Sequence, residues 1–295
     1  MPSYIEPLFR PPSEARSLIF QITVGCSQNR CLFCGMYKGK KFHIRPLHEI
    51  LTEIFEISLY HRPCIDRVFL ADGDALVYPF DDLCTILDAM AATFPGLTRI
   101  ASYASPNSLT TKSAEQLAML RGKRLKIIYF GLESGDDATL LAINKGFEST
   151  RMAELALMAR EAGMKLSVTA ILGLAGRGRS LQHARATAEW VNRVNPEYFS
   201  LLTMFHRHND DFITTLQQCT RRELMLETRK MLQHLHPAKT ILRSNHVSNF
   251  LNLAGSYPKD RERLIVDVDL ALALKHAGPR AGFMDEVPSY QEEYY

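Results

Sequence analysis

The 295-residue sequence contains no long apolar run, little net charge and few cysteines. A helix that crosses a bilayer needs about 20 apolar residues in succession, and no stretch reaches that length. The opening residues, MPSYIEPLFRPPSEA, lack the apolar centre of a signal peptide. The net charge of +3 is too small for a protein whose main role is to coat nucleic acid. We therefore expect a cytoplasmic protein with no membrane partner.

Low-complexity linkers and internal repeats are also absent, and the composition that remains is that of a globular protein. Hydrophobic residues make up 46% and charged residues 23% of the chain, which is enough for a large core. Short apolar runs of β type alternate with helical patterns. The six runs lie at 18–24, 67–71, 98–103, 126–132, 165–172 and 198–203. Apolar residues at helical spacing predict helices over 46–60, 80–94, 112–120, 152–159, 181–194 and 221–236.

Six successive βα units predict an α/β fold with a parallel sheet covered by helices. Polar residues follow the carboxyl end of each strand, where barrel active sites are assembled. We therefore expect a partial (β/α)6 TIM-type barrel with a short C-terminal extension. The expected divisions are an N-terminal lead-in over 1–16, the barrel over 17–237, the extension over 238–277 and a mobile tail over 278–295.

Three of the six cysteines lie within nine residues, as Cys26-x4-Cys31-x2-Cys34, directly after the first predicted strand. In a reducing compartment such a group is typical of metal ligands. Three thiolates can hold three irons of a cubane cluster and leave the fourth iron open. Structural zinc is the alternative, and it would need a fourth ligand such as His43. The loop favours a cluster but leaves zinc open.

The cysteine loop, with Phe33 before its last cysteine, resembles that of the radical S-adenosylmethionine superfamily, whose usual signature is C-x3-C-x-aromatic-C. The likeness covers about 17–204 and is nearest to the branch of the elongator catalytic subunit, the methylthiotransferases and NifB. The segment FRPPSEARSLIFQITVGCSQNRCLFCGMYKGKKF also resembles stand-alone bacterial radical proteins of unsettled reaction in that branch. The first cysteine gap is four residues here, one longer than usual.

The resemblance implies a 4Fe–4S cluster on the three cysteines, and S-adenosylmethionine as the molecule that it cleaves. At the end of the second strand the family has a turn that holds the methionine amino group, and this chain has Asp72-Gly73-Asp74 there. Glycine permits close backbone approach, and a carboxylate can accept from an ammonium. Two acids at a strand end also call for a cation. A polar turn that caps the next helix is the alternative.

Other positions of the expected cofactor site follow later strands. The resemblance implies that Glu133 and Ser134, after the fourth strand, contact the ribose or the amino-acid part of S-adenosylmethionine. Ser102, at the end of the third strand, is a candidate for a similar role. Arg177 follows the fifth strand and could bind the methionine carboxylate through two hydrogen bonds, with Arg179 as the alternative.

Two polar segments are candidates for substrate binding. His206 and His208 follow the sixth strand and could bind a metal or a substrate, or form a simple polar loop. Asn245 and His246 lie between apolar runs, in a segment expected to cover the open end of the barrel. A basic run follows the cysteine loop and consists of Lys38, Lys40, Lys41 and Arg45. It could attract an acidic electron donor such as a flavodoxin or ferredoxin, or the phosphates of a nucleic acid. The alternative is a charged surface that contacts only solvent.

The sequence therefore predicts a radical enzyme. It would cleave S-adenosylmethionine reductively to a 5′-deoxyadenosyl radical, which takes hydrogen from a substrate. That substrate is unknown and could be a small molecule, RNA or a peptide. The sequence does not predict the oligomeric state. The alternatives are a zinc-stabilised nucleic-acid-binding protein and an iron–sulfur protein that only transfers electrons.

Overall fold

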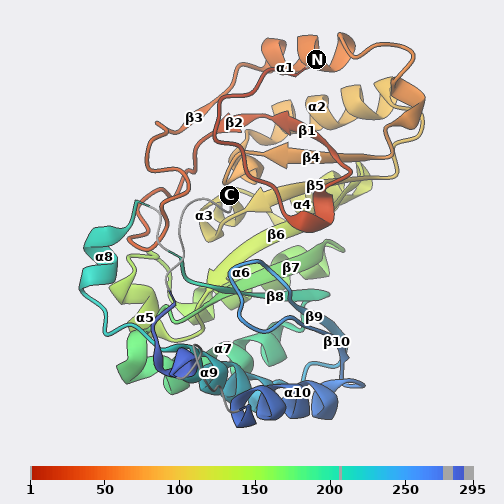
Figure 1. The fold of residues 1–295 in the computed structure, drawn as a ribbon. Helices are drawn as coiled ribbons and strands as arrows, with labels where there is room; N and C mark the ends of the chain where they lie inside the picture. The colour runs from red at the N-terminus through yellow and green to blue at the C-terminus, as the bar shows by residue number, and fades with distance from the viewer. Residues whose placement is uncertain (1, 206–207, 275–281, 289–295) are drawn as a thin grey trace. The chain divides into compact units, whose positions relative to one another are not determined.

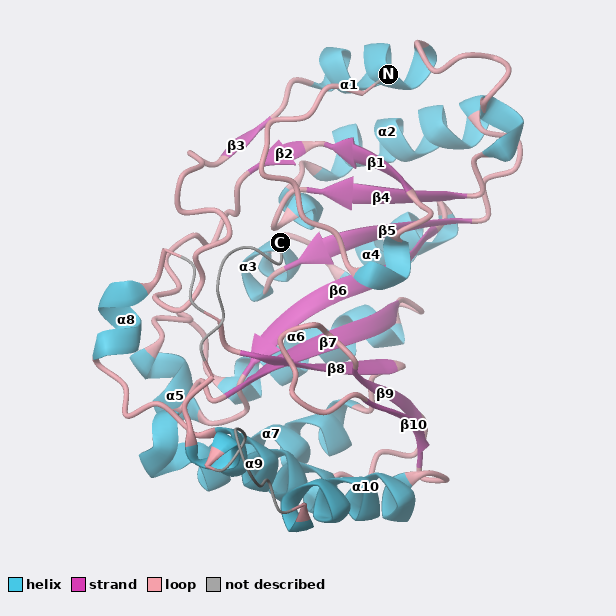
Figure 2. Ribbon diagram, viewed as in Figure 1, coloured by secondary structure: helices cyan, strands magenta, loops and turns pink. Residues whose placement is uncertain are grey.

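The computed structural model describes residues 2–205, 208–274 and 282–288, and it contains an open, mostly parallel sheet of eight strands (Figures 1 and 2). The strand order is β1-β4-β5-β6-β7-β8-β9-β10. These strands span Leu18–Gln21, Arg67–Ala71, Arg99–Ala104, Leu125–Glu133, Lys165–Leu172, Tyr198–Thr203, Thr240–Ser244 and Leu253–Tyr257. A separate antiparallel pair joins β2 and β3, which span Thr23–Val24 and His43–Ile44.

Helices follow the strands as a βα alternation requires. The helices are α1 Leu47–Phe55, α2 Phe80–Thr93, α3 Pro106–Thr110, α4 Ala114–Gly122, α5 Asp137–Ala142, α6 Ser149–Glu161, α7 Gly176–Val194, α8 Asp210–Thr214, α9 Arg221–His234 and α10 Arg261–Ala273. None of the helices in the described part of the chain is long and apolar enough to span a membrane.

The expected α/β fold of the partial-barrel type is confirmed. β1 pairs with β4, β4 with β5, and β7 with β8, in each case in parallel. Two strands were not expected: β9 pairs in parallel with β8, and β10 returns antiparallel to β9. They form the C-terminal extension and lengthen the sheet without closing it.

The chain forms two compact units. Unit 1 comprises residues 1–29, 36–130 and 154–166, and unit 2 comprises residues 30–35, 131–153 and 167–295. Unit 1 thus holds β1 to β5 and most of β6, whereas unit 2 holds β7, apart from its first residues, and β8 to β10. The cysteine loop contributes Cys26 to unit 1 and the other two cysteines to unit 2.

In unit 1 the N-terminal segment lies against the sheet. Leu8 packs on a buried cluster of the parallel strands, together with Ile19, Tyr103 and Tyr129; the cluster is Phe69, Ala71, Ala101 and Ile127. Glu14 is fully buried and accepts hydrogen bonds from the Tyr129 hydroxyl at 2.6 Å and the Arg99 guanidinium at 3.0 Å. Leu8 and Glu14 therefore fix this segment to the sheet of unit 1.

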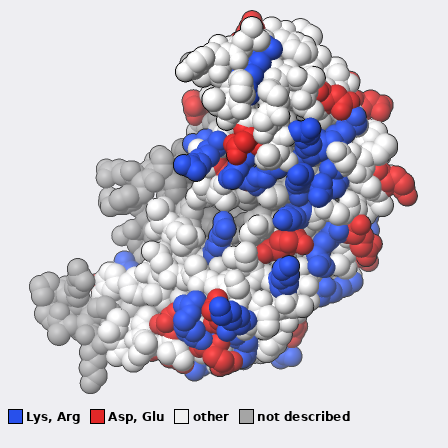
Figure 3. Space-filling view, turned by 90° about the vertical axis from the view of Figure 1, so that its right-hand side faces the viewer, with Lys and Arg blue, Asp and Glu red and all other residues white. Residues whose placement is uncertain are grey.

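Cations stand at the amino ends of the parallel strands in unit 1. Arg67 and Arg99 begin β4 and β5, and Arg124 and Lys126 flank the start of β6. Figure 3 views this side of the molecule and shows Lys and Arg gathered across the middle of the face, with fewer acidic residues between them. This basic face lies at the end of the strands away from the acidic turn.

In unit 2 the helix α9 packs against both α7 and α10, and a C-terminal segment is fixed to the start of α9. Arg221 donates to the Phe283 carbonyl at 3.0 Å and pairs with Glu286 at 3.0 Å. Phe283–Asp285 forms a short 3-10 helix. Of the tail expected to be mobile, 278–281 and 289–295 lie outside the described residues.

Candidate metal centre

The first half of the cysteine loop begins at Gly25, directly after β2. Gly25 has φ +74°, and a Cβ there would lie 3.3 Å from the Lys40 carbonyl. The Gly25 N–H donates to Asp72 Oδ2 at 3.1 Å, while the Gly73 N–H donates to the Gly25 carbonyl at 3.1 Å. Two hydrogen bonds in opposite directions thus fix the residue before Cys26 to the acidic turn.

Asp72 is fully buried and is paired within the protein. Its Oδ2 atom accepts from Lys40 Nζ at 2.8 Å, from Gln21 Nε2 at 3.0 Å and from the Gly25 N–H. Its Oδ1 atom is buried without a hydrogen bond. Acids at this strand end were expected to need a cation, and Lys40 supplies the positive charge beside Asp72.

Asp74 is also fully buried, and it joins three segments. Its Oδ1 atom accepts from the Ser105 N–H at 2.8 Å, and Oδ2 accepts from the Ser105 hydroxyl at 2.7 Å. The Ser27 hydroxyl, one residue after Cys26, also donates to Oδ2. The nearby Lys112 is largely buried, which lowers its pKa to about 8 despite the opposing field of Asp74. Asp74 therefore connects the cysteine loop to the end of β5.

Gly73 leaves room for the two neighbours of the turn. A Cβ on Gly73 would lie 2.5 Å from Tyr37 Cε2 and 2.9 Å from Cys26 Cβ. The Tyr37 ring is buried and meets Phe9 edge-on, with ring centroids 5.6 Å apart. Burial, followed by the fields of Tyr103 and Asp72, raises the pKa of Tyr37 well above its usual value. Only glycine allows Cys26 and Tyr37 to approach this turn so closely.

Ser102 lies inside β5 rather than at its end. It is fully buried, and its hydroxyl donates to the Tyr103 carbonyl at 2.9 Å. The residue that meets the acidic turn is Ser105, which caps α3 in a capping box with Ser108. The S-x-x-S spacing just before a helical pattern is the sequence signal that could have identified it.

The second half of the cysteine loop is anchored within unit 2. The Leu32 N–H donates to the Ile143 carbonyl at 2.9 Å, and Asn209 Nδ2 donates to the Phe33 carbonyl at 2.7 Å. Cys31 is buried, and Cys34 is partly exposed. Sequence reasoning missed these anchors, because their residues lie more than 100 positions from the loop.

Glu133 and Ser134 sit at the carboxyl end of β6. Glu133 has φ +64° and pairs with the buried Lys145 at 3.2 Å. The Ser134 hydroxyl is fully buried and lies 2.7 Å from His183 Nδ1. On the other side of this imidazole, Nε2 lies 3.5 Å from Glu227 Oε1. Glu227 in turn accepts from the Gly173 N–H at 2.9 Å.

This buried row joins the loops that follow β6 and β7. Burial lowers the pKa of His183 to about 4, and burial raises the pKa of Glu227 to about 7. The imidazole is therefore neutral near pH 7. Burial also raises the pKa of Cys219 to about 12, so its thiol stays protonated. Cys219 lines a small pocket with Gly173 and Thr203, at the carboxyl ends of β7 and β8.

The shifted pKa values of His183 and Glu227 predict how the free energy of unfolding depends on pH. A raised carboxyl pKa makes the free energy of unfolding fall as pH rises from about 4.5 to 7, because the folded state binds the proton more tightly. The lowered pKa of His183 acts in the opposite direction between about 4 and 6.5. Glu227→Gln removes the first trend, so its Tm should rise more steeply between pH 4.5 and 6.5 than that of the wild type. Glu189→Gln, at an exposed site on α7, is the control; parallel curves for E227Q and the wild type would contradict the assignment.

The remaining candidates lie in unit 2. Arg177 pairs with Glu223 at 2.8 Å, and Arg179 with Asp136 at 2.8 Å. His208 is exposed with φ +49°, and His206 lies outside the described residues. Asn245 is exposed directly after β9. His246 Nδ1 lies 2.8 Å from the Ser248 hydroxyl, and burial lowers the pKa of His246.

The donor set of the loop fits an iron–sulfur cluster. All six cysteines lie in the described part of the chain, and none forms a disulfide. Within the described ranges, no three His, Cys, Asp or Glu side chains gather around one point as a single metal ion requires. A cubane with one open iron makes a different demand, since each of the other three irons takes its own thiolate. The close approach of Cys26 to Gly73 also places the first thiol beside the turn that ends β4.

Known proteins resemble this chain in sequence and in fold. The sequence model of the Radical SAM superfamily matches residues 20–191, more than half of the chain. No curated protein matches the chain. Among solved structures, coproporphyrinogen III oxidase (HemN) from Escherichia coli, a radical SAM enzyme, is similar at 16% identity and a TM-score of 0.56, over 74% of this chain and 52% of that one.

Two further structures share the fold. Methylornithine synthase (PylB) aligns over 85% of this chain and 68% of its own, with 12% identity and a TM-score of 0.55. The archaeal Methanocaldococcus infernus Elp3 aligns over 88% of this chain and 65% of its own, with 11% identity and a TM-score of 0.51. The present chain thus spans about half the length of HemN, and these likenesses show the fold alone. The family match decides the identity: the chain belongs to the Radical SAM superfamily, whose members are enzymes that use a 4Fe–4S cluster and S-adenosylmethionine.

Proposed function

We propose that Cys26, Cys31 and Cys34 hold a 4Fe–4S cluster with one open iron, and that the protein uses S-adenosylmethionine to abstract hydrogen from a substrate. When bound, the reduced cluster supplies one electron that breaks the sulfur–C5′ bond, giving methionine and a 5′-deoxyadenosyl radical. The substrate then loses one hydrogen atom to that radical and 5′-deoxyadenosine forms.

The observation that carries this proposal is the attachment of Cys26 to the turn that ends β4. The Gly73 N–H donates to the Gly25 carbonyl there, and Gly73 has no side chain to separate Cys26 from the turn. The proposed ligand Cys26 thus lies at the carboxyl end of β4, a parallel strand with neighbours on both sides. This is the edge of a parallel sheet at which barrel enzymes place their reacting groups.

The chain's own residues have distinct tasks in this proposal. The turn Asp72-Gly73-Asp74 offers backbone carbonyls to the methionine ammonium, since Asp72 Oδ2 is already paired with Lys40. Ser102, Glu133, Ser134 and Phe33 remain proposed cofactor contacts. Arg177 would have to exchange Glu223 for the methionine carboxylate. His206, His208, Asn245 and His246 remain proposed substrate residues.

Radical SAM enzymes require an external reductant, and we propose a flavodoxin or a ferredoxin. The basic run next to the proposed cluster exposes fewer positive charges than its sequence implies. Lys40 is buried against Asp72, and Arg45 is buried against Glu53 at 2.8 Å. Only Lys38 and Lys41 remain exposed to meet an acidic surface.

The test is an anaerobic assay of the reconstituted protein with dithionite and S-adenosylmethionine. We expect bound iron and sulfide, together with 5′-deoxyadenosine and methionine in equal amounts. A protein that binds one zinc and no iron would replace this proposal with a zinc-stabilised binding protein. A redox-active cluster without 5′-deoxyadenosine would leave an electron-transfer protein instead.

A further inference from the structure

We propose that Lys40 is a positioning residue for the cysteine loop. Through Asp72 it fixes the start of the loop at Gly25, and the N-terminal segment over 3–9 is the brace that holds Lys40 in place. The part of this inference that concerns cluster binding rests on the proposed function; the part that concerns the brace does not.

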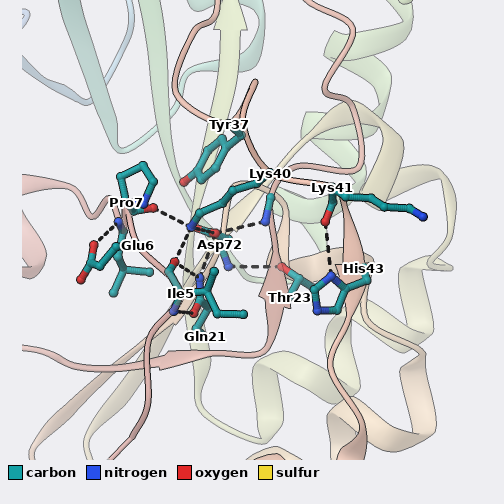
Figure 4. A network of polar contacts seen from close by, with 12 residues as sticks. Ile5, Glu6, Pro7, Gln21, Thr23, Tyr37, Lys40, Lys41, His43 and Asp72 are labelled. Carbon is teal, nitrogen blue, oxygen red and sulfur yellow. Dashed lines mark hydrogen bonds and ion pairs between the residues drawn. The ribbon is translucent and has the colours of Figure 1, made fainter.

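The ammonium of Lys40 has three acceptors, one for each N–H (Figure 4). Nζ lies 2.8 Å from Asp72 Oδ2 and 2.6 Å from each of the carbonyl oxygens of Ile5 and Pro7. The side chain is only 5% exposed. A buried ammonium with all its donors satisfied has a fixed position. Lys40 is therefore a structural cation rather than a solvated charge.

The carboxylate of Asp72 connects the ammonium of Lys40 to the cysteine loop. The Oδ2 atom that accepts from Lys40 also accepts from the Gly25 N–H at 3.1 Å. Gly25 directly precedes Cys26, and its carbonyl is held by the Gly73 N–H. If the ammonium is lost, a buried carboxylate remains without a counter-charge, and its bond to Gly25 loses its support. Lys40 thus acts on Cys26 through one shared oxygen atom.

The N-terminal segment is held by the same group of residues. The amide of Gln21 bonds twice to the backbone of Ile5, through the Ile5 N–H at 2.8 Å and the Ile5 carbonyl at 3.1 Å. Gln21 Nε2 also donates to Asp72 Oδ2 at 3.0 Å. Further along the segment, Phe9 packs edge-on against Tyr37, whose ring covers Gly73. The segment therefore contacts Lys40 and Tyr37 directly, and it is joined to Asp72 through Gln21.

The experiment compares Lys40→Met, Asp72→Asn and the double variant with a matched ion pair. The control variants are Lys123→Met and Asp88→Asn, which break a 2.6 Å pair on the surface of the same unit. Two quantities are measured: hydrogen–deuterium exchange of the backbone over 3–9 in the metal-free protein, and iron retained per chain after anaerobic reconstitution and gel filtration.

Each single variant should speed exchange at Ile5 by about tenfold or more, since exchange follows local opening. Each should also retain less than half of the wild-type iron, whereas the control variants should match the wild type in both measurements. The double variant should be milder than either single variant, because it leaves no buried charge unpaired.

Exchange and iron content in K40M and D72N equal to those of the controls would overturn the proposal. A double variant whose defect is the product of the two single defects would overturn it as well, since independent residues behave in that way. If the wild type itself binds no iron, the proposed function fails, while exchange over 3–9 still decides whether the brace exists.

Discussion

Alanine at Cys26, Cys31 or Cys34 is expected to abolish both cluster binding and the formation of 5′-deoxyadenosine. Each thiolate is the sole protein ligand of one iron in the proposed cluster, and a methyl group cannot replace it. The three variants should therefore be colourless after reconstitution and should produce no 5′-deoxyadenosine above the level without enzyme. Iron analysis and product chromatography measure the two effects.

Cys64 provides the matched control for this prediction. It is exposed in a short 3-10 turn, and it belongs to no cluster in the described part of the chain. Cys64→Ala should therefore keep the colour, iron and product yield of the wild type. The assignment of the ligands fails if any one of C26A, C31A and C34A still forms product at the wild-type rate.

Gly73→Ala is expected to have the next largest effect. The added methyl would lie 2.5 Å from the Tyr37 ring and 2.9 Å from Cys26 Cβ, so either the turn shifts with its loop or both groups move. Overpacking of this kind costs about 1–3 kcal/mol. Because Tyr37 is buried against Phe9, we expect Cys26 and its loop to move. The variant should unfold at a lower temperature and should hold less iron than the wild type.

Gly39→Ala separates this effect from the general consequence of replacing a glycine. Gly39 lies near Tyr37 in the sequence, but a Cβ there would meet nothing within 4 Å. G39A should therefore keep both the Tm and the iron content of the wild type. Equal behaviour of G73A and G39A would mean that the turn tolerates a side chain and that its close approach to Cys26 has no importance.

Much of the fold could be predicted because the central strands are nearly continuous apolar runs. The runs at 67–71, 165–172 and 198–203 are β4, β7 and β8 with the same bounds. The helix after β7 begins at Gly176, five residues before the predicted start. Its first turn consists of glycines and arginines and therefore has no apolar residues at helical spacing. β9 and β10 were missed, since both are short, contain few large apolar residues and are separated by a polar loop.

The candidate site could be predicted only in part, because its charges are paired over long distances in the sequence. The acidic turn was predicted as a site, but its counter-ion Lys40 lies 32 residues away. In the sequence Lys40 belongs to a basic run that could be solvated, whereas in the structure its side chain is buried. The row from Ser134 through His183 to Glu227 likewise spans nearly 100 residues, and neither period nor spacing reveals such a group. The family is confirmed, whereas the particular branch and the individual ligand roles remain predictions.

The docking of the N-terminal segment has a consequence for the order of events during synthesis. Ser13 and Glu14 leave the ribosome early, yet both bond to Tyr129, which follows 116 and 115 residues later. Contacts of such long range form late in folding, because the intervening chain must first close a large loop. Until β6 has emerged, the segment has no complete surface to bind. The newly made protein therefore passes through a stage in which the apolar side chains that later meet Leu8 are open to solvent, and the cysteines are already present before their brace is in place.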